Sequence, residues 1–130
     1  MSDKRLVIHE DEVEEKELPG RMFKQLVGPG AASSEFASIN MVRVAPGTTI
    51  TPAHSHAEGE EIIYIMSGSG AILIDGEVND VKKGCIVVLP RNSIHMTQNN
   101  GKEELKLLCF FAPPTEPGKF VFHKDVEFPK

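Results

Sequence analysis

The sequence predicts an all-β fold, a sandwich or a barrel, from two observations. Gly, Pro and Asn recur at short intervals, and between them lie runs of about five to eight residues rich in Ile, Val, Leu, Phe and Thr, which is typical of many short strands. No stretch after residue 20 shows sustained helical periodicity. A chain of 130 residues can bury its own core, so we expect one domain over residues 1–130.

Each expected strand follows a turn signal. "LPG", "GPG" and "APG" precede the first three, and "AEGE", "SGSG", "KKG", "RNS", "NNG" and "EPG" precede the others. The expected strands are 22–27, 38–45, 49–54, 62–66, 71–74, 86–89, 95–98, 105–111 and 120–122. Residues 1–20 form a charged arm, in which "EDEVEEKEL" is expected to be a solvated segment, with a helical turn as the alternative.

Two of the expected strands are apolar at successive positions. Residues 62–66 and 86–89 show no polar face, whereas an antiparallel strand with one wet face should alternate. We therefore expect both faces of these strands to be covered, one by the barrel interior and the other by the N-terminal segment or a second subunit. A homodimer is the favoured account.

The composition narrows the functional class. The net charge is −5 and no cluster of Lys or Arg stands out, which argues against a nucleic-acid partner. No apolar run approaches the length of a membrane span, and the charged N-terminus lacks a signal-peptide core, so a cytoplasmic location is expected. Cys85 and Cys109 each lie in an apolar run, and we interpret them as buried, inert thiols.

A first group of potential metal ligands lies in the stretch "HSHAEGEEIIYIMSG". His54 and His56 would project from one face of an extended chain, because side chains two apart on a strand share a face. Paired imidazoles suit a first-row transition metal. Glu61 begins the next strand and would face inward together with Ile63, whereas Glu60 would point away and Glu58 would lie in the turn.

A second segment, "GCIVVLPRNSIHMTQN", supplies a third imidazole. It runs through an apolar strand to Pro90, turns at "RNS" and places His95 at the head of another strand. If that strand adjoins the first segment, His95 completes a group of three histidines and one carboxylate. Thr97 is in phase with His95 and would also line the interior.

The two segments together resemble the motifs of the cupin family. The first motif, at 47–68, has Gly47, His54, His56, Glu61 and Gly68 at the family's spacing except for one extra residue before His54. The second motif, at 84–99, has Gly84, Pro90, His95 and Asn99 in register, with Asn92 where the family usually has Gly. Asn92 suits that position because Asn adopts left-handed backbone conformations readily.

The resemblance implies a small double-sheet jelly-roll barrel, commonly dimeric, with one divalent metal ion inside. Its ligands would be His54, His56, Glu61 and His95, and Asn99 would be a strand-end residue. Nitrogen and oxygen ligands without thiolate fit Mn, Fe, Ni, Co, Cu or Zn, and affinity order alone does not choose among them.

The chemistry is less sharply defined than the metal site. Tyr64 points away from Glu61, and of Asn40 and Arg43, which lie on opposite faces of one strand, at most one points inward. No general base or pair of carboxylate-binding arginines stands out. We therefore expect a small metalloenzyme acting on a small organic acid or hydroxy-carbonyl compound, either a dioxygenase or similar to oxalate decarboxylase.

Two alternatives stay open. The first is a barrel that binds a small ligand without catalysis. The second is a sugar-phosphate isomerase or epimerase, which would need phosphate contacts, and Lys82, Lys83 and Arg91 are the only cations near the motifs. A solvated loop is the preferred interpretation of these three residues.

Overall fold

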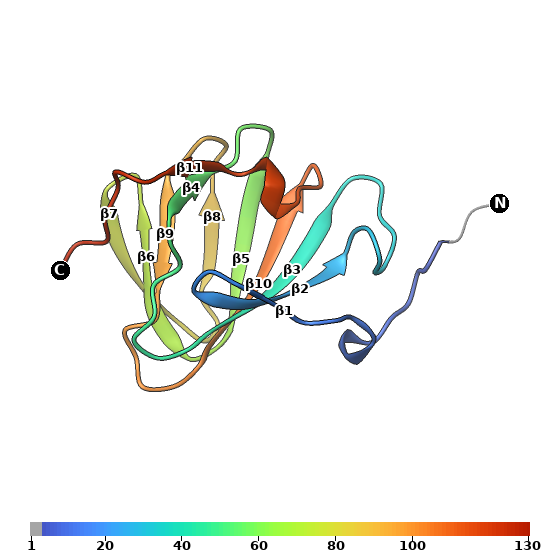
Figure 1. The fold of residues 1–130 in the computed structure, drawn as a ribbon, viewed down its shortest axis with the longest axis horizontal. Helices are drawn as coiled ribbons and strands as arrows, with labels where there is room; N and C mark the ends of the chain where they lie inside the picture. The colour runs from blue at the N-terminus through green and yellow to red at the C-terminus, as the bar shows by residue number, and fades with distance from the viewer. Residues whose placement is uncertain (1–3) are drawn as a thin grey trace.

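The computed structural model describes residues 4–130, which form two antiparallel sheets that face each other (Figure 1). The first three residues of the charged arm lie outside the described residues. In spatial order, the first sheet contains β1 (Lys16–Leu18), β2 (Arg21–Val27), β3 (Ser38–Val44), β10 (Leu105–Ala112), β5 (Glu60–Ser67) and β8 (Ile86–Leu89). The second contains β11 (Val121–His123), β4 (Ala53–Ser55), β9 (His95–Gln98), β6 (Ser69–Ile74) and β7 (Glu77–Lys82). The predicted all-β jelly-roll barrel is confirmed.

The expected strands are all present, with differences at their ends and two additions. The strand expected at 49–54 is reduced to β4, because Pro52 has no N–H group to donate to a neighbouring strand. The prediction missed β1, which lies in the charged arm, and β7, whose sequence "EVNDVK" is largely polar and exposed. The arm also contains a short 3-10 helix, η1 (Glu10–Glu12). Of the two alternatives for this segment, the structure therefore shows the helical turn.

The core lies between the two sheets. β5 alternates strictly, with Ile63 and Ile65 almost fully buried and Ile62 and Tyr64 facing outward. Residues from both sheets contribute to the same cluster, including Ile72 from β6 and Leu107 from β10. Inward positions are therefore set by the period of two along each strand.

The outer face of β5 and β8 is not covered by any residue in the range 4–130. Ile62 and Val88 are paired across the two strands, and their exposed fractions are 42% and 53%. Ile86 beside them is 68% exposed. The N-terminal segment instead contacts β2, where Lys24 donates to the Glu10 carbonyl. Of the two covers expected from the sequence, the N-terminal segment does not lie on this face.

The β1–β2 hairpin closes one side of the barrel. Figure 1 shows it reaching from the first sheet towards the chain that precedes β4. At its turn, Gly20 has φ +79°, and a Cβ there would lie only 2.8 Å from the Thr49 carbonyl oxygen. The turn therefore packs directly on the backbone of Thr49 and Ile50, and it places the start of β2 over the interior.

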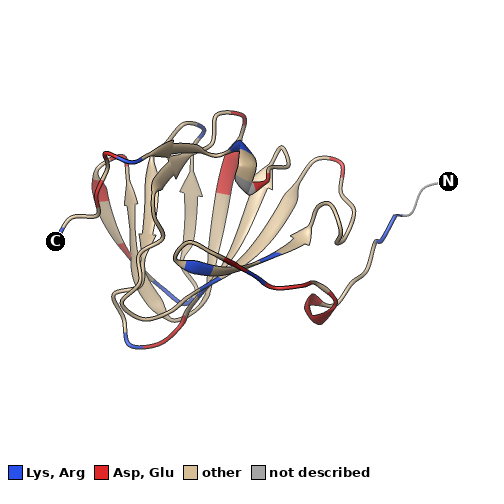
Figure 2. Cartoon of the chain, in the orientation of Figure 1, with Lys and Arg blue, Asp and Glu red and all other residues tan. Residues whose placement is uncertain are grey.

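The C-terminal segment crosses the opposite sheet. β11 pairs with β4, and Val126 and Phe128 pack against a small cluster around Met96. Just before β11, the 3-10 helix η2 (Pro117–Lys119) leads Phe120 to the end of the barrel. Lys and Arg are scattered over strands and loops (Figure 2). Within residues 4–130, no helix has the length and apolar character to cross a membrane.

Candidate metal centre

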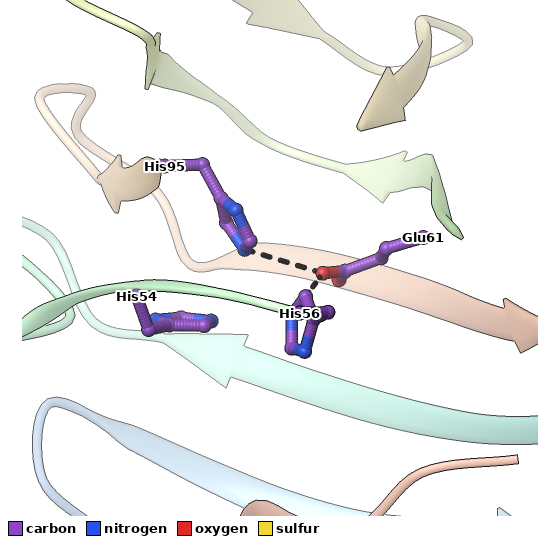
Figure 3. A group of neighbouring side chains, drawn as sticks. All are labelled: His54, His56, Glu61 and His95. Carbon is purple, nitrogen blue, oxygen red and sulfur yellow. Dashed lines mark ion pairs between the residues drawn. The ribbon is translucent and has the colours of Figure 1, made fainter. Parts of the chain in front are cut away.

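Four side chains that are distant in the sequence meet inside the barrel. His54 lies on β4, His56 directly follows it, Glu61 lies on β5 and His95 begins β9. Each offers one nitrogen or oxygen atom, and these atoms all lie within 4.8 Å of one another. The structure thus brings together all four of the residues that the sequence singles out (Figure 3).

Strand register accounts for this convergence. His54 is the direct cross-strand partner of His95 in the second sheet. Glu61 enters from the first sheet, where it pairs with Phe111 of β10 and Leu89 of β8. Its neighbour Glu60 is exposed, as is Glu58 in the turn, so Glu61 is the one of these three carboxylates that faces inward.

Glu61 lies at the centre of the group. Its Oε1 is 3.0 Å from His56 Nε2 and 3.2 Å from His95 Nε2 (Figure 3). The three side chains are 8% exposed or less. The His54 and His95 ring centroids are 4.3 Å apart. The group is therefore compact, and all of it except the half-buried His54 is almost completely shielded from water.

Two of the imidazoles are oriented by backbone carbonyls. His54 Nδ1 lies 3.4 Å from the Pro52 oxygen, and His95 Nδ1 lies 3.3 Å from the Ser93 oxygen. When Nδ1 donates its hydrogen to a carbonyl, the lone pair is on Nε2, the usual arrangement of a histidine that binds a metal. The backbone before β4 and β9 thereby helps to aim both rings.

Several buried atoms of the group lack a hydrogen-bond partner within residues 4–130. They are both ring nitrogens of His56, Nε2 of His95 and Oε1 of Glu61, whose contacts are close but poorly aligned for hydrogen bonding. Buried polar atoms are normally paired, because an unpaired one costs about 1–3 kcal/mol. A cation held between Nε2 of His56, Nε2 of His95 and Oε1 of Glu61 would satisfy these three atoms, so the residues present fit a metal ion.

The protonation states also suit a cation. Burial lowers the pKa of His54 to about 3, and the neighbouring His95 adds to this effect. Burial by itself would raise the pKa of Glu61, but its contacts with His56 and His95 outweigh burial and lower it. A neutral imidazole and an ionised carboxylate are the forms that metal binding requires. The group could therefore hold a metal ion of the nitrogen- and oxygen-binding class.

Phe120 covers the group from one side. Its ring stacks on His54 with centroids 4.9 Å apart and an interplanar angle of 6°, and it meets His56 edge to face at 4.5 Å. The sequence predicts only a strand at this position. A single Phe after "EPGK" has no pattern that would reveal its contact with residues more than sixty positions away.

A small cavity of about 40 Å³ adjoins the group and is lined by three of its members, His54, Glu61 and His95. Ile50, Ile63 and Thr97 line it, which confirms the expected phase of Thr97 with His95. Val87 does not line it and belongs to the core. The wall also contains Arg21 and Cys109, which were not expected there, and Asn40, one of the two residues left open on β3.

The structure decides which of Asn40 and Arg43 on β3 points inward. Asn40 faces the interior and is 2% exposed. Arg43 faces outward, where it forms ion pairs with Glu15 and with Glu104, the latter at 2.6 Å. The interior arginine is Arg21, on the same face of β2 as buried Phe23. The alternation of Arg21 and Phe23 could have predicted the inward position of Arg21, although this residue lies next to a turn and just outside the strand that we expected.

Cys109 is buried, as expected, and Cys85 is half-buried. Burial raises the pKa of the Cys109 thiol, and the nearby Glu61 carboxylate raises it further. The thiol is therefore protonated at neutral pH, which agrees with the interpretation as an inert residue.

The turn residues of the second motif are structural. Asn92 has φ +71°, the left-handed conformation expected from its place in the motif. Asn99 is fully buried and donates to the Val44 and Glu103 carbonyls, both at 2.8 Å, as suits a strand-end residue. Lys82, Lys83 and Arg91 are exposed and do not line the cavity.

Comparison with known proteins connects this barrel to established sequences and structures. An uncharacterised protein, MJ1618, of Methanocaldococcus jannaschii is 32% identical over 108 residues, which cover 83% of this chain and 81% of that protein. The nucleoside dehydratase Pac13 of Streptomyces has a TM-score of 0.77 at 15% identity, with 92% of each chain covered. An oxalate decarboxylase of Lactobacillus farciminis, solved as a formate complex, has a TM-score of 0.81 at 19% identity over 93% of this chain and 36% of that one.

These structural likenesses, at identities below one in five, show the fold. The sequence itself carries the family assignment, since the family model described as the cupin domain matches residues 40–111. This range includes both motifs and all four of the clustered side chains. The chain therefore belongs to the cupin family.

Proposed function

We propose that His54, His56, Glu61 and His95 bind one divalent transition-metal ion, and that the protein is a small metalloenzyme acting on a small organic acid or hydroxy-carbonyl compound. The observation that carries the proposal is that the four residues each offer a ligand atom within 4.8 Å of the others, and that three of them are buried and have unpaired atoms. When bound, the ion would supply Lewis acidity, or a redox centre if it is iron or manganese.

The protein's own residues would bind and shield the reactants. His54 and His95 are aimed by the carbonyls of Pro52 and Ser93, so the site is organised before a ligand arrives. Phe120 covers the imidazoles, and most of the remaining wall is aliphatic or aromatic, which excludes water. Exclusion of water strengthens every electrostatic contact inside the cavity.

The cavity size favours a small substrate. A cavity of about 40 Å³ is small, which favours a compact substrate over a nucleoside or a polyketide. The related barrel of the Lactobacillus farciminis oxalate decarboxylase was solved with formate, so this fold holds a small acid in at least one other protein. Both observations support the small acid over the larger substrates found among proteins of this fold.

Metal content tests the proposed ligands. Untagged protein, purified without a metal column and reloaded with Mn²⁺, Fe²⁺ or Zn²⁺, is expected to retain about one ion per chain by elemental analysis. His95→Ala and Glu61→Gln should lose most of it, because each removes one of four ligands. His9→Ala is the matched control, since His9 is exposed and distant from the group. Equal metal retention by His95→Ala and His9→Ala would contradict the assignment.

A non-catalytic binding barrel is the second candidate, and one observation favours it. Among the described residues that line the cavity, Glu61 is the only carboxylate and there is no lysine, so a general base other than a metal ligand is absent from the wall. Oxygen-uptake and carbon-dioxide-release screens with small acids separate the two candidates. Metal-dependent product supports the enzyme, and saturable binding without product under any metal supports the binding barrel.

The isomerase or epimerase alternative has less support. A sugar phosphate needs cations for its phosphate group. Lys82, Lys83 and Arg91 are exposed and lie outside the cavity wall, which contains one cation, Arg21, among its described residues. The cavity is also small for a phosphorylated sugar.

We also propose that two chains pair through the outer face of β5 and β8. Ile62, Tyr64, Ile86 and Val88 form a contiguous apolar surface there. Light scattering on a size-exclusion column should give a dimer for the natural chain and a monomer for the double variant Ile86→Lys and Val88→Lys. Val78→Lys is the control, because Val78 is 44% exposed on the other sheet. A natural chain that elutes as a monomer would overturn this proposal.

A further inference from the structure

Arg21 is a partly buried cation without a carboxylate partner. It starts β2 on the inward face, and it lines the cavity together with Glu61. Its Nη1 donates to the Pro19 carbonyl at 3.0 Å, which uses one of the five N–H groups of the guanidinium. Within residues 4–130 it forms no ion pair, whereas Arg5 and Arg43 pair with carboxylates at the surface.

The structure holds Arg21 in this place. The turn at Gly20 packs on the backbone of Thr49 and Ile50. Directly after Arg21, β2 begins its pairing with β3 at Met22, so the backbone is held on both sides of Arg21. Burial lowers the pKa of Arg21, and the nearby Cys109 and Glu61 oppose this change. Arginine nevertheless stays charged at neutral pH, because its pKa lies so far above 7. Its guanidinium is therefore a charged donor at the cavity wall, with N–H groups beyond the one that bonds to Pro19.

Asn40 is a second unpaired polar group in the same cavity. It is 2% exposed, and its Oδ1 has no hydrogen-bond partner in the described part of the chain. It lies inward on β3, next to Cys109 of β10. The rest of the wall on this side is apolar, with Phe23 and Val42 among its residues. The cavity therefore has a polar group on two neighbouring strands, β2 and β3, in addition to the four clustered residues.

The charges indicate the kind of ligand. The three imidazoles are neutral ligands, and the charges of Glu61 and Arg21 cancel each other, so a bound divalent ion would leave two positive charges in the cavity. Without Arg21 only one would remain. A guanidinium binds a carboxylate through two parallel hydrogen bonds, which a single amide or hydroxyl group cannot do. A dianion thus matches the cavity better than a monoanion.

We propose that Arg21 and Asn40 form an anion subsite that binds the second carboxylate of a small dicarboxylic acid, whose first carboxylate lies at the four-residue cluster. Arg21 is the specificity-determining residue for the charge of the substrate. Asn40, whose unpaired Oδ1 is an acceptor, contributes a hydrogen bond to the same group by turning its amide so that Nδ2 donates. The inference rests on the proposed function for the first carboxylate, and on Arg21 and Asn40 alone for the second.

Fumarate and crotonate are suitable probes, because they have nearly the same shape and differ in the second carboxylate, which fumarate cannot fold back onto the same metal ion. Calorimetry on zinc-loaded protein should show fumarate binding at least ten-fold more tightly than crotonate. Arg21→Met should bring the ratio close to one, and Asn40→Leu should weaken fumarate several-fold. Arg91→Gln, at an exposed arginine outside the cavity, should leave the ratio unchanged.

Equal binding of the two acids by the natural chain, or an unchanged ratio in Arg21→Met, would overturn the subsite. If Arg21→Met does not fold, Arg21→Lys replaces it, and the loss of the two-bond geometry should still reduce the ratio several-fold. The metal-free protein separates this inference from the proposed function. Fumarate should raise its melting temperature more than crotonate does, and this difference should vanish in the Arg21 variant even if no metal binds.

Discussion

At the scale of single residues, alternation along a strand decides which polar groups enter the barrel. Glu60 and Glu61 are neighbours, yet Glu60 is exposed, whereas Glu61 is only 5% exposed and lies at the centre of the cluster. Asn40 and Arg43 differ in the same way on β3. A period of two is a strong constraint, because a shift by one residue would turn every side chain of the strand to the other face.

Asn99 provides a test at this scale. Its side chain donates to the carbonyls of Val44 and Glu103 and accepts from the Gly101 amide at 2.9 Å, so it connects the ends of three segments. Asn99→Ala should lower the free energy of unfolding by about 2–3 kcal/mol, because buried carbonyls lose their donors. Urea denaturation measures this change. Asn100→Ala, at the exposed next position, should change it by less than about 0.5 kcal/mol, and similar losses in both variants would contradict the role of Asn99.

At the scale of elements, the β1–β2 hairpin is positioned both by strand pairing and by the packing of its turn. β2 is held by its pairing with β3 from Met22 to Val27, β1 is the edge strand of the sheet, and the turn between them packs closely on the backbone before β4. Because Arg21 directly follows this turn, the hairpin connects backbone packing to the composition of the cavity wall.

Gly20→Ala tests the packing of the hairpin. The new Cβ would meet Thr49 O at 2.8 Å and Ile50 Cα at 3.0 Å, both on the backbone. Gly76→Ala is the matched control, because Gly76 also has a positive φ but a Cβ added there would meet no atom within 4 Å. Strain from the left-handed backbone should cost each variant about 1–2 kcal/mol, and Gly20→Ala should lose about 1–2 kcal/mol more from the clash. Thermal denaturation compares them, and equal losses would show that the turn can move away.

At the scale of the whole molecule, the proposed ion would join the two sheets. Glu61 comes from the first sheet, whereas His54 and His95 come from the second, so an ion held by all of them would cross-link the barrel. Removal of the ion should therefore affect the stability of the entire domain and not only the site.

Calorimetry with and without a chelator measures this coupling. A metal present at about a hundred times its dissociation constant should stabilise the folded chain by about 2.7 kcal/mol, because it binds the folded form preferentially. For a domain of this size the melting temperature should rise by roughly 10 °C. His54→Ala should show little or no rise, whereas His9→Ala should behave like the natural chain. A rise of the same size in His54→Ala would mean that the ion stabilises the protein from another place.

The sequence by itself determined most of the strands and the all-β class, because turn residues mark the ends of strands and the period of two assigns each side chain to a face. The jelly-roll class and the set of four clustered residues were implied by the resemblance of the two motifs to the cupin family. The same rules failed for β1 and β7, whose sequences are polar because neither strand has a strongly buried face.

Only the tertiary structure decided what surrounds the cluster. The period of two turns Arg21 and Asn40 inward, but only the packing of the strands and of the C-terminal segment brings them to one cavity with Phe120. This arrangement depends on contacts between segments far apart in the sequence, which no local period encodes. The same reason applies to the outer face of β5 and β8, since an apolar run indicates burial but does not say which other segment or chain provides the cover.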